Sequence, residues 1–180
     1  MKFRLPIGVC VVISLVLVLF GVVFGTVSGY TDDRKQVTAL LEEEDGLRDV
    51  LCYRGADGLN LCVVAGRHLD AGEESLLRLK DAAENLRSSG RSLTEKRSDA
   101  ADMEAAWQEV SALLKQTASF EESDRDTAYL AMLTADQQSL SGSAAVSAYN
   151  SAASAFNRKL TGTFIGKLAG LFGIKPCELF

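Results

Sequence analysis

The N-terminal segment constrains this chain most. No charged residue occurs from Leu5 to Tyr30, and residues 7–27 are almost entirely apolar. A helix needs about 20 apolar residues to cross a bilayer core, and this stretch meets that length. A secretory signal has a shorter apolar region of roughly 7 to 15 residues. Although 26-TVS-28 has the composition of a cleavage site, the length of the apolar stretch favours an uncleaved membrane anchor, which comprises residues 1–31.

The charges beside this span predict its orientation. Lys2 and Arg4 precede the span, and Arg34 and Lys35 follow it. Lys and Arg near the ends of a span favour the cytoplasmic side, and the free amino group tips the balance toward the N-terminus. We therefore expect a single-pass protein of the cell membrane, with its N-terminus in the cytoplasm and its main domain outside.

Residues 32–180 predict an all-α domain. Pro occurs only at positions 6 and 176, and Pro is excluded from helix interiors. Apolar residues at helical spacing form four stripes, over residues 37–63, 76–86, 93–117 and 124–160. Such stripes must be buried against one another, which predicts an elongated antiparallel four-helix bundle. The formal net charge of −5 argues against a nucleic-acid partner.

Local residues refine these boundaries. Gly55 and Gly58 are expected to loosen the first helix, and the fourth stripe shifts by two residues after Gly142. Ser92 with Glu95 forms a capping box, the pairing that starts a helix, and 70-DAGE-73 resembles one with Asp as the cap.

An aromatic–Asn pair occurs twice near the C-terminus. Tyr149-Asn150 and Phe156-Asn157 are seven residues apart, or two helical turns and about 10 Å on one face. The aromatic residues fall on the apolar stripe, which predicts that they pack in the bundle. The two Asn residues lie at its edge, where each is expected to hydrogen-bond to a neighbouring helix and fix its register, as polar residues do in coiled coils.

These pairs and the tail 168-LAGLFGIKPCELF-180 resemble the LemA family, which has Tyr-Asn, five residues, a second aromatic–Asn pair and an apolar, glycine-rich tail. The stretch 54-RGADGLNL-61 is similar to a second segment of that family. The matching residues are Arg54, Asp57, Asn60, Tyr149, Asn150, Phe156, Asn157, Gly170, Phe172, Gly173, Pro176 and Phe180.

The chain departs from the family pattern at two places. It reads Gly58-Leu59-Asn60 where the family has Ile-Pro-Asn, and Thr163-Phe164 where the family has Phe-Pro. The resemblance implies a membrane-anchored four-helix bundle with no established reaction. It also implies structural rather than catalytic roles for the matching residues.

Motifs for chemistry are missing from the sequence. His68 is the single histidine, so neither the paired Glu-x-x-His of di-iron bundles nor the His-Glu-x-x-His of zinc proteases is present. A Ser-His-Asp set around His68 has no local motif, and we expect His68 at a helix end beside the last carbonyls. We therefore predict no catalytic, metal or cofactor-binding residue, and a protein that is not an enzyme.

The four cysteines predict no disulfide. Cys52 and Cys62 are roughly 15 Å apart if they share one straight helix, beyond the reach of a disulfide. Cys10 lies in the anchor and Cys177 in the tail, and no Cys-x-x-Cys motif occurs.

The apolar tail, residues 161–180, leaves two alternatives open. It folds back over the bundle end, or it lies on the membrane surface as an interfacial helix. For function, we expect a non-catalytic scaffold or interaction module that binds an unknown protein partner or itself. The alternative is an extracytoplasmic sensor that binds a small ligand through Asn60, Asn150 and Asn157.

Overall fold

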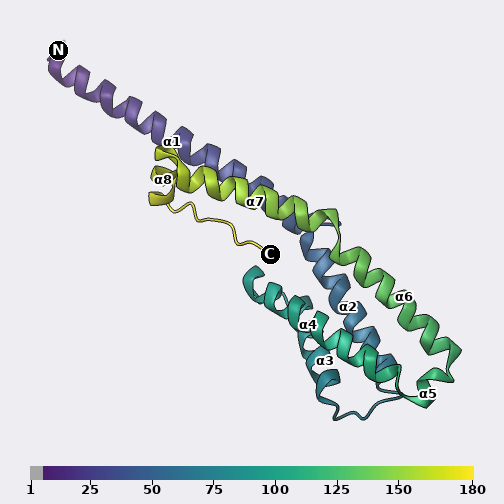
Figure 1. The fold of residues 1–180 in the computed structure, drawn as a ribbon. Helices are drawn as coiled ribbons and strands as arrows, with labels where there is room; N and C mark the ends of the chain where they lie inside the picture. Colours follow the sequence, from purple (N-terminus) through teal and green to yellow (C-terminus); the bar gives the residue numbers. More distant parts are fainter. Residues whose placement is uncertain (1–5) are drawn as a thin grey trace. The chain divides into compact units, whose positions relative to one another are not determined.

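The computed structural model describes residues 6–180, which form helices and no strand (Figure 1). The all-α prediction is therefore confirmed for this part of the chain. Lys2 and Arg4, on which the predicted orientation depends, lie outside it. The helices are α1 (Ile7–Glu42), α2 (Leu47–Ala65), α3 (Glu74–Arg87), α4 (Leu93–Leu114), α5 (Ala118–Glu121), α6 (Asp124–Ser141), α7 (Ala144–Gly162) and α8 (Phe164–Leu171).

The chain divides into two compact units. The first contains the residues up to Thr38 together with Ala152–Cys177, and the second contains Ala39–Ser151 together with Glu178–Phe180. The first unit thus holds most of α1, the second half of α7, and α8. The second unit holds α2 to α6 and the first half of α7.

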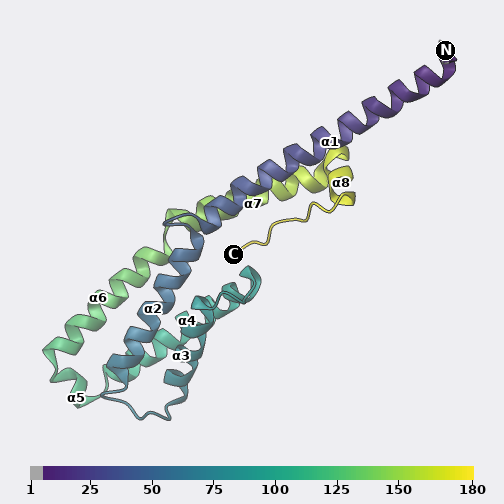
Figure 2. The ribbon, with the colours of Figure 1, turned by 180° about the vertical axis from the view of Figure 1, so that it is seen from behind.

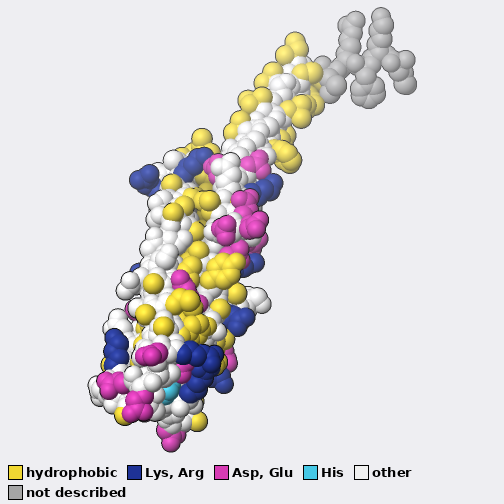
Figure 3. Space-filling view, turned by 90° about the vertical axis from the view of Figure 1, so that its right-hand side faces the viewer, with side chains coloured by type: hydrophobic (Ala, Val, Ile, Leu, Met, Phe, Trp, Pro, Cys, Tyr) yellow, Lys and Arg dark blue, Asp and Glu magenta, His cyan; other side chains and the backbone are white. Residues whose placement is uncertain are grey.

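Helix α1 of the first unit is long and apolar enough to span a membrane. Residues 7–22 are all exposed, and hydrophobic side chains lie along the visible face of this part of the helix (Figure 3). Farther along, Tyr30 and Val37 are buried. The Tyr30 ring meets Phe156 of α7 edge-on, with 6.4 Å between the ring centroids. The second half of α7 therefore runs beside the second part of α1 (Figures 1 and 2).

The second unit is built around α2. Helix α2 packs against α3 on one side and α6 on another, and α3 packs against α4 (Figure 2). The side chains that are most fully enclosed come from all four helices: Leu47, Leu51, Leu61, Val64, Leu79, Leu86, Met103, Val110, Leu114 and Leu133. The predicted fourth helix is in fact two helices, α6 and α7, because the chain turns at Gly142, where the apolar stripe shifts.

The prediction for Gly55 and Gly58 is wrong. Both lie inside α2, and the break in the first predicted helix occurs at residues 43–46 instead. A Cβ atom at Gly55 would lie 2.6 Å from the carbonyl oxygen of Ala83 in α3, and one at Gly58 would lie 2.8 Å from the Ala83 Cβ. The two glycines therefore let α2 and α3 approach closely, and they do not loosen the helix.

Of the two predicted capping boxes, one is confirmed. Ser92 accepts a hydrogen bond from the Glu95 backbone, and Glu95 accepts one from the Ser92 backbone. Helix α3, in contrast, begins at Glu74 without a side-chain cap, so the prediction for Asp70 is wrong. The Asp70 carboxylate accepts a hydrogen bond from Gly72 N at 2.8 Å and so shapes the preceding turn.

Candidate functional site

A groove of about 1170 Å³ lies between α4 and α6 in the second unit, and we call it the α4–α6 groove. Small side chains line both of its walls. Ala101 and Ala112 contribute from α4, and Ala131, Thr134 and Ala135 contribute from α6. Small residues on facing walls leave room for an additional element to approach both backbones closely.

Arg54 of α2 also lines the groove. Arg54 Nε donates to Gln137 Oε1 at 3.1 Å, and Gln137 Nε2 donates back to Arg54 O at 2.8 Å. The guanidinium also lies 3.7 Å from the Glu104 carboxylate. Burial lowers the Arg54 pKa, and the Glu104 charge partly opposes that effect. These polar groups are bonded to one another, so they join α2 to α4 and α6.

The apolar floor of the groove includes Trp107, which is only 5% exposed. The nearby Ser111 hydroxyl is also buried, and it has no hydrogen-bond partner within residues 6–180. Lys115 and Phe120 also line the groove. The groove is thus mainly apolar, and its charged lining residues are Arg54, Glu104 and Lys115.

The first group of predicted motif residues is not gathered at one site. Arg54 is buried, Asp57 is half-buried and Asn60 is exposed. Each step of three residues falls about 60° short of a full helical turn, so the three side chains progress around α2. Burial raises the Asp57 pKa, and nearby Asp136 adds to the effect. Asn60 lines a separate cavity of about 560 Å³ together with Arg67.

The second group, on α7, binds the C-terminal tail. Asn150 Nδ2 donates to Phe180 O at 2.8 Å, and Phe180 N donates to Asn150 Oδ1 at 2.9 Å. Asn157 makes the same pair of bonds with Cys177, both at 2.7 Å. The prediction that these Asn residues bond to a neighbouring helix is therefore wrong, because each amide pairs with tail backbone instead.

The aromatic members of the two pairs behave as predicted. Tyr149 and Phe156 are buried, and the Tyr149 hydroxyl donates to Glu178 O at 2.9 Å. Both therefore pack within the fold, and Tyr149 adds one more bond to the tail.

The remaining predicted tail residues shape the end of α8. Gly173 has a φ of 92°, a conformation that favours glycine. Gly173 N donates to Gly170 O at 3.1 Å, and Ile174 N donates to Ala169 O at 3.3 Å. This is the Schellman arrangement that ends helices. Phe172 and Pro176 are exposed, whereas Phe180 is half-buried.

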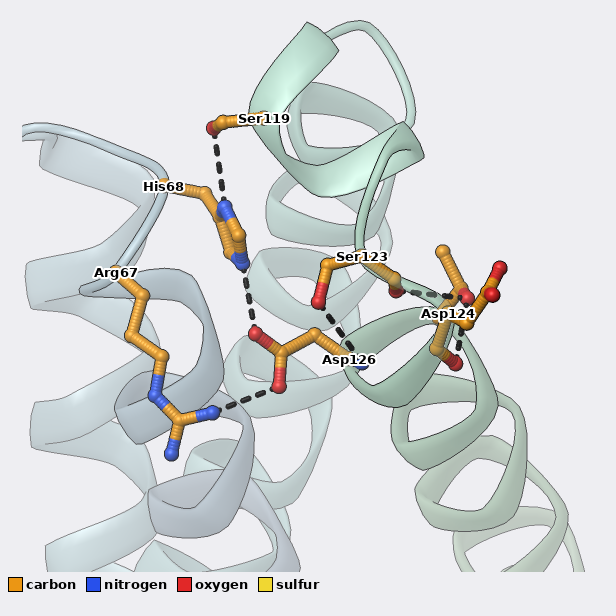
Figure 4. Close-up of polar contacts among 7 residues, drawn as sticks. Arg67, His68, Ser119, Ser123, Asp124 and Asp126 are labelled. Atoms are coloured by element: carbon orange, nitrogen blue, oxygen red, sulfur yellow. Dashed lines mark hydrogen bonds and ion pairs between the residues drawn. The ribbon is translucent and has the colours of Figure 1, made fainter.

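His68 lies in the turn after α2, and its ring bonds to side chains (Figure 4). Nε2 is 2.9 Å from Asp126 Oδ2, and Nδ1 is 3.0 Å from Ser119 Oγ. Arg67 donates to the other oxygen of Asp126 at 2.7 Å. The expected contact of His68 with helix carbonyls is therefore wrong. The only signal for Asp126 in the sequence was its position in the first turn of a predicted helix.

This His68–Asp126 cluster contains a serine, a histidine and an aspartate in series, but its geometry favours a structural role. The hydrogen bond from His68, with further help from the Arg67 charge, lowers the Asp126 pKa. The two carboxylate oxygens of Asp126 are thus each bonded, one to His68 and the other to Arg67. The 560 Å³ cavity beside Arg67 and Asp126 is lined by neither His68 nor Ser119. The cluster joins the end of α2 to α5 and to the start of α6.

Residues 6–180 contain no group of three His, Cys, Asp or Glu side chains placed to hold a metal ion and no disulfide. Cys10, Cys52, Cys62 and Cys177 are free. Burial raises the Cys62 pKa to about 11.

No protein-family model matches this chain, and comparisons with curated proteins and with solved structures also give no match.

Proposed function

We propose that this protein is a membrane-anchored, non-catalytic interaction module of the LemA type, which binds a helix of a protein partner in the α4–α6 groove. The groove itself is the observation that carries the proposal. It combines an apolar floor at Trp107 with small residues on both walls. Helix-in-groove recognition uses this combination, since the apolar face of an amphipathic helix needs a hydrophobic channel.

The dimensions of the groove fit a helix. It follows α4 from Ala100 to Lys115, which is about 22 Å at 1.5 Å per residue. A partner helix of about four turns has the same length. Such a helix would pack against α4 and α6 and cover the buried hydroxyl of Ser111. In this proposal α2, α3, α4 and α6 form the antiparallel four-helix arrangement that carries the groove.

A small-ligand sensor is the alternative function, and the side chains favour it less. A ligand site needs polar groups that converge on the ligand. In the groove, Arg54 and Gln137 bond to each other. Asn150 and Asn157 bond to the tail backbone. Two of the three Asn side chains proposed to recognise a ligand, Asn150 and Asn157, are therefore occupied, and Asn60 lies apart from them on α2.

Attachment to the membrane is the second part of the proposal. Helix α1 supplies the span, and the protein is placed in the cell membrane as a single-pass protein with its domain outside the cytoplasm. An anchor confines the groove to the membrane surface, where its partner would also be found.

Photo-crosslinking tests the groove. A benzophenone amino acid replaces Ala131 in the groove, or Leu77 on the exposed face of α3, in the full-length protein in its native membrane. We expect a crosslinked product from position 131 and not from position 77, with the reacted partner peptide mapping to an amphipathic helix. Adding Ala135→Trp should fill the groove and remove the product while the circular dichroism spectrum is retained.

Two results would contradict the proposal. Equal products from positions 131 and 77 would show non-specific contact, and an Ala135→Trp variant that crosslinks normally would place binding elsewhere. Co-expression of two differently tagged copies identifies self-association, because the partner peptide then comes from this chain.

A further inference from the structure

Helix α8 has its side chains arranged in the opposite way from a helix on a water-soluble surface. Its buried residues are the small ones, Gly166 and Ala169. Most of its large apolar residues point outward: Phe164 is 82% exposed and Leu171 is 83% exposed, whereas Leu168 is half-buried. A surface helix of a soluble protein buries its large apolar residues and exposes its polar ones.

The exposed apolar residues of α8 form a group. Ile165 and Phe172 are also exposed, so four large apolar side chains face outward within nine residues of sequence. A group of this kind marks a contact with protein or with membrane. Its position in the first unit decides between these two.

The start of α8 is attached to α1 at the end of the apolar span. Thr163 caps α8 by accepting a hydrogen bond from Gly166 N, and its hydroxyl lies 3.1 Å from the Tyr30 hydroxyl of α1. Tyr30 also donates to Lys159 O at 3.3 Å. Tyr30 follows Val27, the last residue of the span, by three residues, or about 5 Å along the helix.

The covered face of α1 also extends to the end of the apolar span. Val23, Thr26 and Val27 are partly covered and Tyr30 is buried, whereas residues 7–22 are exposed throughout. These four covered positions share one helix face, the face that meets α7. Packing in the first unit therefore reaches the last turn of the apolar span. In two opposite views α8 lies beside α1 where α7 ends (Figures 1 and 2).

We propose that α8 is an interfacial membrane helix, whose exposed apolar face contacts the boundary between acyl chains and headgroups of the bilayer that α1 crosses. This inference rests on the proposed membrane anchoring. Tyr30 lies at the depth where aromatic residues gather at membrane interfaces. Lys167 and Lys175 are exposed beside the apolar face, where long cationic side chains reach the headgroups. The first unit then has two attachments to the bilayer, α1 through it and α8 on its surface.

Tryptophan quenching by brominated lipids tests this proposal on the full-length chain. In a Trp107→Phe background, single tryptophans replace Leu171 on α8, Leu17 in the middle of the span, or Leu77 on α3. Each protein is reconstituted into phosphatidylcholine vesicles whose acyl chains carry bromine either near the headgroup or near the chain end. We expect the tryptophan at 171 to be quenched mainly by bromine near the headgroup, the one at 17 mainly by bromine near the chain end, and the one at 77 by neither. Phe172→Trp is a second reporter, because its ring is already exposed.

The outcomes separate this inference from the anchoring on which it rests. If position 17 is quenched and positions 171 and 172 are not, α8 does not contact lipid although the anchor stands. Disulfide crosslinking of a Leu171→Cys variant in the same vesicles would then show that a second copy covers α8. If position 17 is also unquenched, the anchoring itself is contradicted.

Discussion

Asn157 and Cys177 exchange two hydrogen bonds of 2.7 Å, so the Asn side-chain amide pairs with the tail as a peptide group of a neighbouring strand would. Asn150 repeats this arrangement with Phe180. Seven helical residues rise about 10.5 Å, and three extended residues cover about 10 Å. The spacing of the two Asn residues on the helix therefore matches the spacing of their partners in an extended tail.

We expect Asn157→Ala to lower the free energy of unfolding by about 1–3 kcal/mol, because two hydrogen bonds are lost and two backbone groups of Cys177 are left without their partner. Urea unfolding of the full-length protein in detergent, followed by circular dichroism, measures the change. The Cys177 amide should also exchange its hydrogen faster.

Asn150→Ala should have a comparable effect, and a shortened chain provides its control. In a protein that ends at Cys177, the partner of Asn150 is already removed, so Asn150→Ala should lower the free energy of unfolding only slightly further. Additive losses from the substitution and the truncation would show that Asn150 acts independently of the tail.

Gly55→Ala should separate α2 from α3. The added methyl group would lie 2.6 Å from a backbone oxygen of Ala83, which cannot move away as a side-chain end can. We expect a loss of stability of about 1–3 kcal/mol or more from this overpacking. Gly162→Ala is the matched control, because a Cβ there meets nothing within 4 Å; it should be neutral or stabilise by up to about 1 kcal/mol. Equal effects at both positions would contradict the close approach of α2 and α3.

The lowered pKa of Asp126 predicts a dependence of stability on pH. Its folded pKa lies below its unfolded value, so the carboxylate stabilises the fold fully above about pH 4 and loses that effect as the pH falls through the lowered value. Asp126→Asn should therefore be less stable than the natural protein at pH 7, with a difference that shrinks in acid. Thermal unfolding across this range measures it. Asp124→Asn, in the same helical turn, is the control, and an equal pH dependence in both variants would contradict the role of the His68–Asp126 cluster.

Cys62 should react slowly with alkylating reagents. Burial raises its pKa from 9.0 to about 11, and since the thiolate is the reactive form, the reactive population falls about 100-fold. The measurement is the iodoacetamide rate at pH 8 for a variant in which the other three cysteines are serine. Unfolding in urea should restore the rate of an ordinary thiol. A fast reaction in the folded protein would mean that the contact of α2 with α3 opens readily.

The helices could be predicted from the sequence because their determinants are local. The period of apolar residues indicated the helical stretches, and Ser92 with Glu95 marked the start of α4. Where the prediction for helices failed, at Gly55 and Gly58, the deciding contact came from Ala83 in another helix. Local rules cannot reveal such a contact, since a glycine that loosens a helix and one that admits a neighbour look alike in the sequence.

The polar sites were harder to predict for the same reason. His68 and Asp126 are 58 residues apart, and only the turn after α2 and the start of α6 bring them together. The groove between α4 and α6 exists because both helices pack around α2, a property of the assembly and not of either stripe.

The sequence by itself determined that the chain is helical, that one segment is apolar over the length of a bilayer, and that Tyr149 and Phe156 are buried, because periodicity and composition act within a helix. Only the tertiary structure decided what the two Asn residues bind, that α8 carries most of its large apolar residues outward, and that a groove remains open. Each of those depends on which backbone lies opposite a given side chain, and that is set by packing between segments far apart in sequence.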